Sequence, residues 1–291
     1  MKFDGVLTAL VTPFKKGRVD TKSLKRLVRD QLDGGVDGFV VNGTTAESPT
    51  LTTAEVEKIY KVVKTETGKA VPLVLGVGSN STAQTIQNLK LANKLKADAV
   101  LVVAPYYNKP PQRGLVEHFR AVAKASKKPV ILYNVPGRTV ISMDADTVGT
   151  LSKVRNIVGI KEASGDMKLH RQIQNNVSKS FLLSSGDDGT CMDFAKLGGH
   201  GVISVISHLI PEQMTEILAS CRKGEASGIA DYKKFDRLNK LMGIEPNPMP
   251  VKMGLYLKGI IDSPELRLPL VNLSKDNTDA LKKEMKRLEL I

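Results

Sequence analysis

The chain alternates between short apolar runs and longer segments in which apolar residues recur every three or four positions. The apolar runs are rich in Val, Ile and Leu and are bounded by turn residues, a pattern typical of buried β-strands. Eight strands are predicted in this way, at 6–12, 38–42, 71–77, 99–104, 129–135, 157–163, 181–185 and 202–207. One helix is expected between successive strands, as in "TKSLKRLVRDQLDGG", "TTAEVEKIYKVVKTETG" and "STAQTIQNLKLANKLK", each with Ser or Thr near its start.

This alternation of strand and helix indicates βαβ units and therefore a parallel sheet. Eight units within roughly 220 residues favour a closed (β/α)8 TIM barrel over an open doubly wound sheet, which usually has fewer strands. The sequence therefore predicts an α/β protein with a barrel over 1–224 and a C-terminal helical extension over 225–291 that packs outside the barrel. The segment "EPNPMP" at 245–250 is expected to form a turn between the late helices.

Composition is that of an ordinary globular protein, with 41% hydrophobic and 25% charged residues, so disorder is excluded. Two cysteines, Cys191 and Cys221, are too few for a disulfide framework, and the chain has no CxxC motif. We therefore expect a cytoplasmic protein. No stretch approaches the roughly 18 consecutive apolar residues of a membrane span, so no membrane association is expected.

The net charge of +13 raises the question of nucleic-acid binding. Lys and Arg are spread over presumed helix faces and mixed with Asp and Glu, and aromatic residues make up only 4% of the chain. A nucleic-acid-binding protein would be expected to have stacking platforms or a basic motif beside its charge. We therefore expect no nucleic-acid partner.

In a TIM barrel, function is located where the strands end and the following loops begin. Lys161 lies at the end of the sixth predicted strand, where an inward-facing side chain belongs. An amine in apolar surroundings loses solvation mostly in its charged form, which favours the neutral nucleophile that condenses with a ketone to give a Schiff base. The alternative is that the strand ends one residue earlier and Lys161 reaches water or pairs with Glu162.

Other strand ends bring polar groups to the same rim. Tyr133 and Tyr107 are candidates for proton transfer through their phenols, with Thr44 as a hydroxyl bridge, although such residues are more often structural. The loop at 43–45 offers backbone N–H groups and hydroxyls suited to a small carboxylate. Arg138 lies on a tight loop, and its planar guanidinium group can form two parallel hydrogen bonds to a second carboxylate. The alternative is that Arg138 is an ordinary surface arginine.

Other catalytic schemes find less support. The four histidines are scattered without metal-ligand spacing, and neither a Walker A motif nor GxSxG occurs. We therefore expect neither a metal nor a phosphate-binding loop.

Nine motifs together carry a resemblance to a known family. They are "ALVTPF", "GTTAES", "APYYNKP", "LYNVPGRT", "GIKEASGD", "LSSGDD", "GGHGVISV", "EPNPMPVK" and "LRLPL". In their order and spacing they resemble, nearly end to end, the dihydrodipicolinate synthase family of pyruvate-dependent Schiff-base lyases. The resemblance implies condensation of pyruvate with L-aspartate 4-semialdehyde in lysine and diaminopimelate biosynthesis. The arginine of "YNVPGRT" resembles the synthase pattern and not that of the related sugar-acid lyases, which lack it.

By resemblance, Lys161 forms the imine with pyruvate, and Thr44, Tyr107 and Tyr133 match a proton-relay triad. In the family the residue matching Tyr107 completes the neighbouring subunit's site, which implies a homodimer, usually within a homotetramer. No metal or organic cofactor is implied.

The resemblance also assigns binding roles. Thr45 matches a residue that holds the pyruvate carboxylate, and Arg138 matches one that binds the semialdehyde carboxylate. Gly186 and Ile203 match backbone positions lining the pyruvate pocket. Ala46 departs from the family's usual glycine, which affects rate and affinity more than reaction type.

Two alternative functions remain open from the sequence. One is a sister aldolase that acts on 2-keto-3-deoxy sugar acids through the same imine, and Arg138 argues against it. The other is a non-catalytic barrel that binds a polyanion, and the intact set of reactive side chains argues against that.

Many relatives are inhibited by L-lysine, but sensitive ones carry an imidazole or aromatic group and a carboxylate where this chain has Thr53, Val56 and Gln84. A neutral amide gives no opposing charge to an ammonium, and charge-assisted hydrogen bonds are roughly twice as strong as neutral ones. We therefore expect little inhibition of the initial rate by millimolar L-lysine, unless Glu55 restores the charge.

Overall fold

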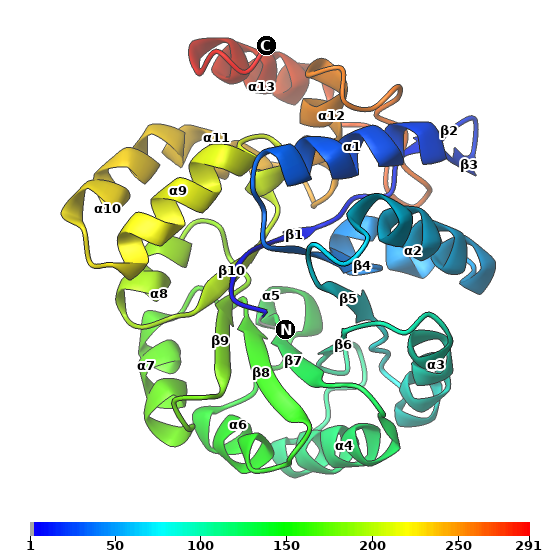
Figure 1. The fold of residues 1–291 in the computed structure, drawn as a ribbon, viewed down its shortest axis with the longest axis vertical. Coiled ribbons are helices and arrows are strands. Elements are labelled where there is room, and N and C mark those ends of the chain that lie inside the picture. The colour runs from blue at the N-terminus through cyan, green and yellow to red at the C-terminus, as the bar shows by residue number, and fades with distance from the viewer. Residues whose placement is uncertain (1–2) are drawn as a thin grey trace.

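The computed structural model describes residues 3–291 and shows a closed parallel barrel surrounded by helices (Figure 1). Its strands are β1 (Gly5–Ala9), β4 (Gly38–Val41), β5 (Leu73–Gly76), β6 (Ala99–Val103), β7 (Val130–Asn134), β8 (Ile157–Glu162), β9 (Leu182–Ser185) and β10 (Gly201–Ser204). They follow one another in chain order around the barrel, and β1 closes it by pairing in parallel with both β4 and β10. The TIM barrel and its eight predicted strands are confirmed.

Helices cover the outside of the barrel between successive strands (Figure 1). They are α1 (Thr21–Asp33), α2 (Thr53–Thr67), α3 (Thr82–Lys94), α4 (Gln112–Ala125), α6 (Ala145–Ser152), α7 (Met167–Asn176), α8 (Cys191–Lys196) and α9 (Pro211–Arg222), with the short α5 (Pro136–Thr139) in the loop after β7. The sequence pattern did not predict the small hairpin of β2 (Phe14–Lys15) and β3 (Arg18–Val19). This hairpin is too short to show an alternating pattern.

Side-chain caps explain where several helices begin. The Asp20 carboxylate accepts hydrogen bonds from two backbone N–H groups of α1, and Ser81 caps α3. At α2, Thr52 and Glu55 form a reciprocal capping box. Such a cap satisfies N–H groups that have no partner within the helix, and it contributes about 1 kcal/mol.

The core has two layers. A small cluster fills the barrel interior and includes Leu7, Val40, Val74, Ile131 and Ile203. A larger cluster lies between the outer face of the strands and the helices. Because β-strand side chains alternate between the two faces, strands buried on both sides must be apolar throughout, which is why the strands appear as continuous apolar runs in the sequence.

The C-terminal extension contains α10 (Ala226–Tyr232), α11 (Asp236–Met242), α12 (Met249–Leu257) and α13 (Lys275–Arg287). The first helix of the extension, α10, begins at Ala226, close to the predicted domain boundary between residues 224 and 225. The division into two domains itself stays a prediction. The segment after α12 contacts α1, where Arg26 donates to the Ile260 carbonyl and Ser23 accepts from the Asp262 N–H. The extension does more than pack outside, because residues of α11 and of the following turn line the cavity at the strand ends.

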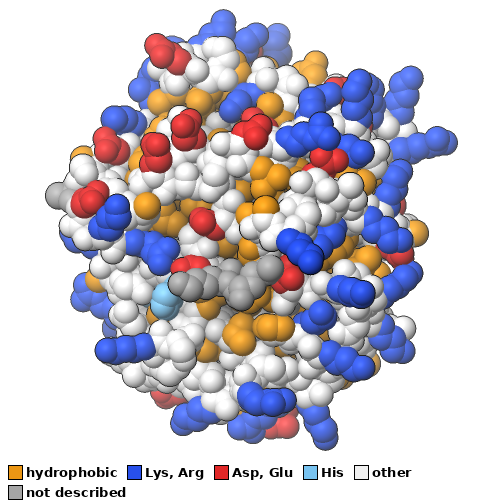
Figure 2. Space-filling view, viewed as in Figure 1, with side chains coloured by type: hydrophobic (Ala, Val, Ile, Leu, Met, Phe, Trp, Pro, Cys, Tyr) orange, Lys and Arg blue, Asp and Glu red, His pale blue; other side chains and the backbone are white. Residues whose placement is uncertain are grey.

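The basic side chains do not form a single patch on the face that Figure 2 shows. Figure 2 shows Lys and Arg over much of one face, with Asp and Glu among them. No helix within residues 3–291 has the length and apolar character needed to cross a lipid bilayer.

Candidate active site

A cavity of about 540 Å³ lies beside the carboxyl ends of the barrel strands. Six of the eight predicted site residues line it: Thr44, Thr45, Tyr133, Arg138, Lys161 and Gly186. The extension contributes another part of the wall, from Asp236, Asn239, Lys240, Met242, Gly243 and Asn247. The barrel thus brings together residues that are more than 140 positions apart in the chain.

Lys161 lies inside β8, with only 6% of its surface exposed. It pairs in register with Tyr133 of β7, and its Nζ is 4.5 Å from the centre of that tyrosine ring. Among residues 3–291, Nζ has no hydrogen-bond or ion-pair partner. The amine is therefore buried, unpaired and directed at the cavity.

Glu162 does not neutralise this amine. Neighbouring residues of a strand point to opposite faces, and the Glu162 carboxylate accepts instead from Asn134 Nδ2 at 2.7 Å and from the Ser164 N–H at 2.6 Å. Burial raises the pKa of Glu162. The alternative in which Lys161 pairs with Glu162 is wrong.

Gly186 provides the space that the lysine side chain occupies. A Cβ at this position would lie 2.7 Å from Lys161 Cε and 2.7 Å from Ala163 Cβ, closer than real Cβ contacts allow. Its backbone N–H donates to the Glu162 carbonyl at 2.7 Å, which fixes the loop after β9 against β8. A side chain at this position would therefore displace both Ala163 and the Lys161 side chain.

The loop after β4 forms a short 3-10 turn, Thr44–Ala46. The N–H groups of Thr44 and Thr45 donate to no other residue in the described part of the chain, so they are available to a carboxylate. Ala46 is buried and its φ is not positive, so its methyl group causes no backbone strain here. The Ala46 carbonyl accepts from the Thr12 hydroxyl at 2.9 Å.

Arg138 lies on α5, and its Nη2 donates to the backbone carbonyl of Asn247 at 3.3 Å. The Asn247 side chain in turn donates to Thr45 Oγ1 at 2.9 Å. Asn247 therefore joins the two predicted carboxylate-binding residues. The sequence analysis missed this role because it interpreted "EPNPMP" only as a turn. The signal available was a polar residue between two prolines, which make a turn rigid.

Tyr107 and Ile203 lie outside the lining of this cavity. Tyr107 is 87% exposed and has a φ of 74°, an unusual backbone conformation for a residue other than glycine. Ile203 is buried in the cluster that fills the barrel interior. A single chain therefore does not bring Tyr107 to Lys161.

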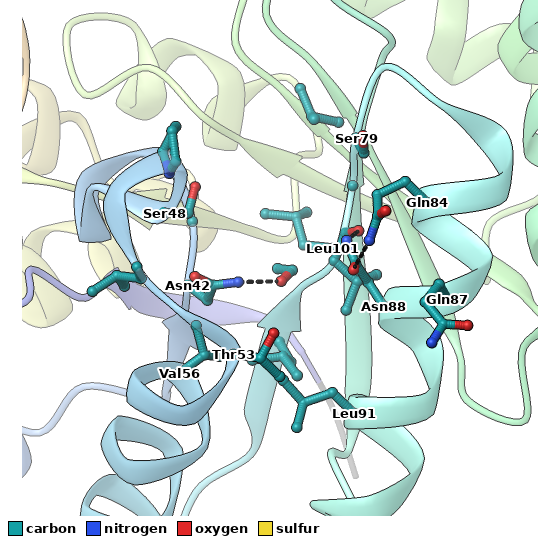
Figure 3. Close-up of a pocket in the computed structure, with 18 of the residues that line it drawn as sticks. Asn42, Ser48, Thr53, Val56, Ser79, Gln84, Gln87, Asn88, Leu91 and Leu101 are labelled. Atoms are coloured by element: carbon teal, nitrogen blue, oxygen red, sulfur yellow. Dashed lines mark hydrogen bonds between the residues drawn. The ribbon is translucent and has the colours of Figure 1, made fainter.

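A second cavity of about 670 Å³ lies between α2 and α3 (Figure 3). Its wall includes Thr53, Val56 and Gln84, whose amide donates to Asn88. Glu55 does not supply the missing negative charge, because its carboxylate is bound by Arg267. Among residues 3–291, Glu57 contributes the only carboxylate in the lining, and it contacts Lys61 and Lys94. Weak inhibition by L-lysine stays a prediction, and it is favoured because this carboxylate is already paired with lysines of the protein.

Comparisons with known proteins agree with this geometry. Residues 2–288 match the model of the Dihydrodipicolinate synthetase family. The chain is 52% identical over 290 residues to 4-hydroxy-tetrahydrodipicolinate synthase of Bdellovibrio bacteriovorus, with 99% of each covered. It superposes on dihydrodipicolinate synthase of Thermotoga maritima with a TM-score of 0.97 and 39% identity, covering 99% of each chain. It superposes equally well, with a TM-score of 0.97, 38% identity and full coverage of both, on the chloride-inhibited Acinetobacter baumannii enzyme complexed with pyruvate.

Proposed function

The chain belongs to the dihydrodipicolinate synthetase family, and from this premise we propose that it catalyses the 4-hydroxy-tetrahydrodipicolinate synthase reaction, which is a lyase reaction of lysine and diaminopimelate biosynthesis. Its substrates are pyruvate and L-aspartate 4-semialdehyde. The observation that carries the assignment of the nucleophile is the buried, unpaired amine of Lys161 beside Tyr133.

The reaction begins with attack of the Lys161 amine on the ketone carbon of pyruvate. Loss of one water gives the imine, which is protonated and acts as an electron sink. A proton then leaves the methyl group, and the electron pair of that C–H bond forms an enamine. The Thr44 and Thr45 N–H groups are placed to hold the carboxylate during these steps.

The enamine carbon next attacks the aldehyde carbon of the second substrate, and the aldehyde oxygen takes up a proton to become a hydroxyl. The amino group of the semialdehyde adds to the imine carbon and closes the ring. Lys161 leaves as a free amine. The sequence of steps consumes one pyruvate and one semialdehyde, releases one water and involves no net oxidation.

Protons must move between the substrates and solvent during these steps. Tyr133 is buried next to Lys161, and Thr44 lines the same cavity, so both are placed for proton transfer. Arg138 lines the cavity, which supports a role for it in binding the carboxylate of the semialdehyde. A 2-keto-3-deoxy sugar acid has no carboxylate at that end, so Arg138 favours the synthase over the sister aldolase.

Trapping with pyruvate and borohydride tests the imine. We expect reduction to add the mass of one pyruvate-derived group to Lys161, because no other described lysine is both buried and unpaired at the cavity. The measurement is peptide mass spectrometry after digestion. Lys252 is a built-in control, since it is fully buried in an ion pair and should stay unmodified. An unmodified Lys161 would exclude both imine reactions and leave the non-catalytic barrel.

Tyr107 supports an assembly in which two copies share their sites. It is exposed in the single chain and held in a left-handed conformation, and such conformations are concentrated at functional sites. We propose that it reaches the cavity of a second copy, as a member of the proton relay, within a homodimer or a homotetramer.

Mixing two inactive variants tests this arrangement. A dimer of one Lys161→Ala chain and one Tyr107→Ala chain has one site with both wild-type residues if Tyr107 acts across the interface. Refolding equal amounts together should restore about a quarter of wild-type turnover, because half of the dimers are mixed and each has one intact site. Turnover no greater than that of the separate variants would show that Tyr107 does not complete the site of a second copy.

A further inference from the structure

Glu47 directly follows the turn that is placed to hold the pyruvate carboxylate. Its backbone has a φ of 57°, in the left-handed region that is unfavourable for residues other than glycine. Its side chain is fully buried, with one carboxylate oxygen accepting from Lys252 Nζ at 2.7 Å and the other from the Arg267 backbone N–H at 2.9 Å. A charged side chain next to the site is thus held inside the protein and away from the cavity.

Both partners of Glu47 come from the C-terminal extension. Lys252 lies on α12, is fully buried and also donates to the Glu265 carbonyl. Its ammonium lies 4.4 Å from the centre of the Phe14 ring, and the Arg267 guanidinium lies at the same distance from that ring. We call Glu47, Lys252 and Arg267 the clamp.

Stability alone does not account for the clamp. Removing two charges from water is unfavourable for each ion, and a buried ion pair is often no more stable than apolar residues of similar volume. Burial lowers the pKa of Lys252 to about 8, which reflects that cost. Strained backbone persists only where the surrounding structure enforces it, and here the strain lies one residue beyond the turn.

We propose that Glu47 is a positioning residue for the reaction, and that the clamp holds the Thr44–Ala46 turn in the geometry that binds the pyruvate carboxylate. The connection is short and covalent. The Glu47 N–H donates to the Thr44 carbonyl at 3.0 Å, and the Glu47 carbonyl accepts from both the N–H and the hydroxyl of Thr50. A shift of Glu47 therefore moves Thr44 and Thr45 with it.

The clamp is tested by comparing Glu47→Gln with the double variant Glu47→Gln/Lys252→Met. The single variant leaves the Lys252 charge buried without its partner, so it should lower the melting temperature and raise the pyruvate KM. The double variant removes both charges and should regain much of the melting temperature. Its pyruvate KM should nevertheless stay about ten- to a hundredfold above wild type, the effect expected of a misplaced binding group.

Glu284→Gln is the matched control. Glu284 is also a buried carboxylate of the extension, paired with Arg287 on α13, but it lies outside the site. It should lose stability while keeping the wild-type pyruvate KM and the wild-type rate of imine trapping. A double clamp variant that also kept both wild-type values would overturn the proposal and make the clamp purely structural.

This inference rests on the proposed function, and the two fail differently. If wild-type protein does not trap pyruvate on Lys161, the proposed function fails. If wild-type protein traps pyruvate and the clamp variants trap it equally fast, only the positioning role of Glu47 fails.

Discussion

Turnover is expected to fall by more than about a thousandfold when Lys161 is replaced by alanine, because the variant has no other buried amine at the cavity to form the imine: Lys240, the other lysine in the described lining, is exposed to solvent. The fold should survive. Lys161 has no hydrogen bond or ion pair to another described residue that the change would break. Steady-state rates with both substrates, together with circular dichroism, measure the two parts of this expectation.

Lys258→Met is a suitable control for the loss of a buried lysine. Lys258 is partly buried, and its Nζ donates to the Leu209 carbonyl at 2.8 Å, outside the cavity. This variant should keep near-wild-type turnover even if it loses some stability. A folded Lys161→Ala protein with turnover near wild type would show that another group does the chemistry.

Use of the semialdehyde is expected to fall about a hundredfold in kcat/KM when Arg138 is replaced by alanine, since a charge-assisted pair with a carboxylate contributes about 1.5–3 kcal/mol. Imine formation should change little, because Arg138 contacts the Asn247 carbonyl and not Lys161. The measurement is kcat/KM for each substrate, alongside the rate of pyruvate trapping.

Arg138→Lys separates charge from shape. This variant keeps the positive charge but lacks the planar guanidinium group. It should therefore recover only part of the kcat/KM for the semialdehyde that the alanine variant loses. If the rate of pyruvate trapping in Arg138→Ala falls as steeply as turnover, Arg138 acts on pyruvate. That result would contradict its proposed role in binding the semialdehyde.

Local sequence pattern was sufficient for the barrel, and it singled out Lys161 as a candidate nucleophile. Strands buried on both faces are apolar throughout, and Lys161 is conspicuous because it interrupts such a run. Gly186 has an equally local consequence, since any side chain there would occupy the space of Lys161 Cε. Lys161 and Gly186 could be singled out in this way because each is recognised by its own position, within a strand for Lys161 and directly after a strand for Gly186.

Contacts across the chain could not be predicted in the same way. Glu47 and Lys252 are 205 positions apart, and Asn247 and Thr45 are 202 apart. Each of these residues follows an ordinary local pattern, so nothing near it indicates its partner. Tyr107 is a different case, because its proposed role depends on a second copy of the chain.

The extension residues that line the cavity are also the last part of the site to be synthesised on the ribosome. A ribosome releases the N-terminal part of a chain first, so the strands that carry Lys161 and Tyr133 emerge well before 236–267. Until those later residues dock, the cavity lacks the Asn247 amide and Glu47 lacks both partners. In a nascent or prematurely ended chain Lys161 therefore lies in an incomplete pocket, and we expect catalytic competence only once the extension has been synthesised and has docked.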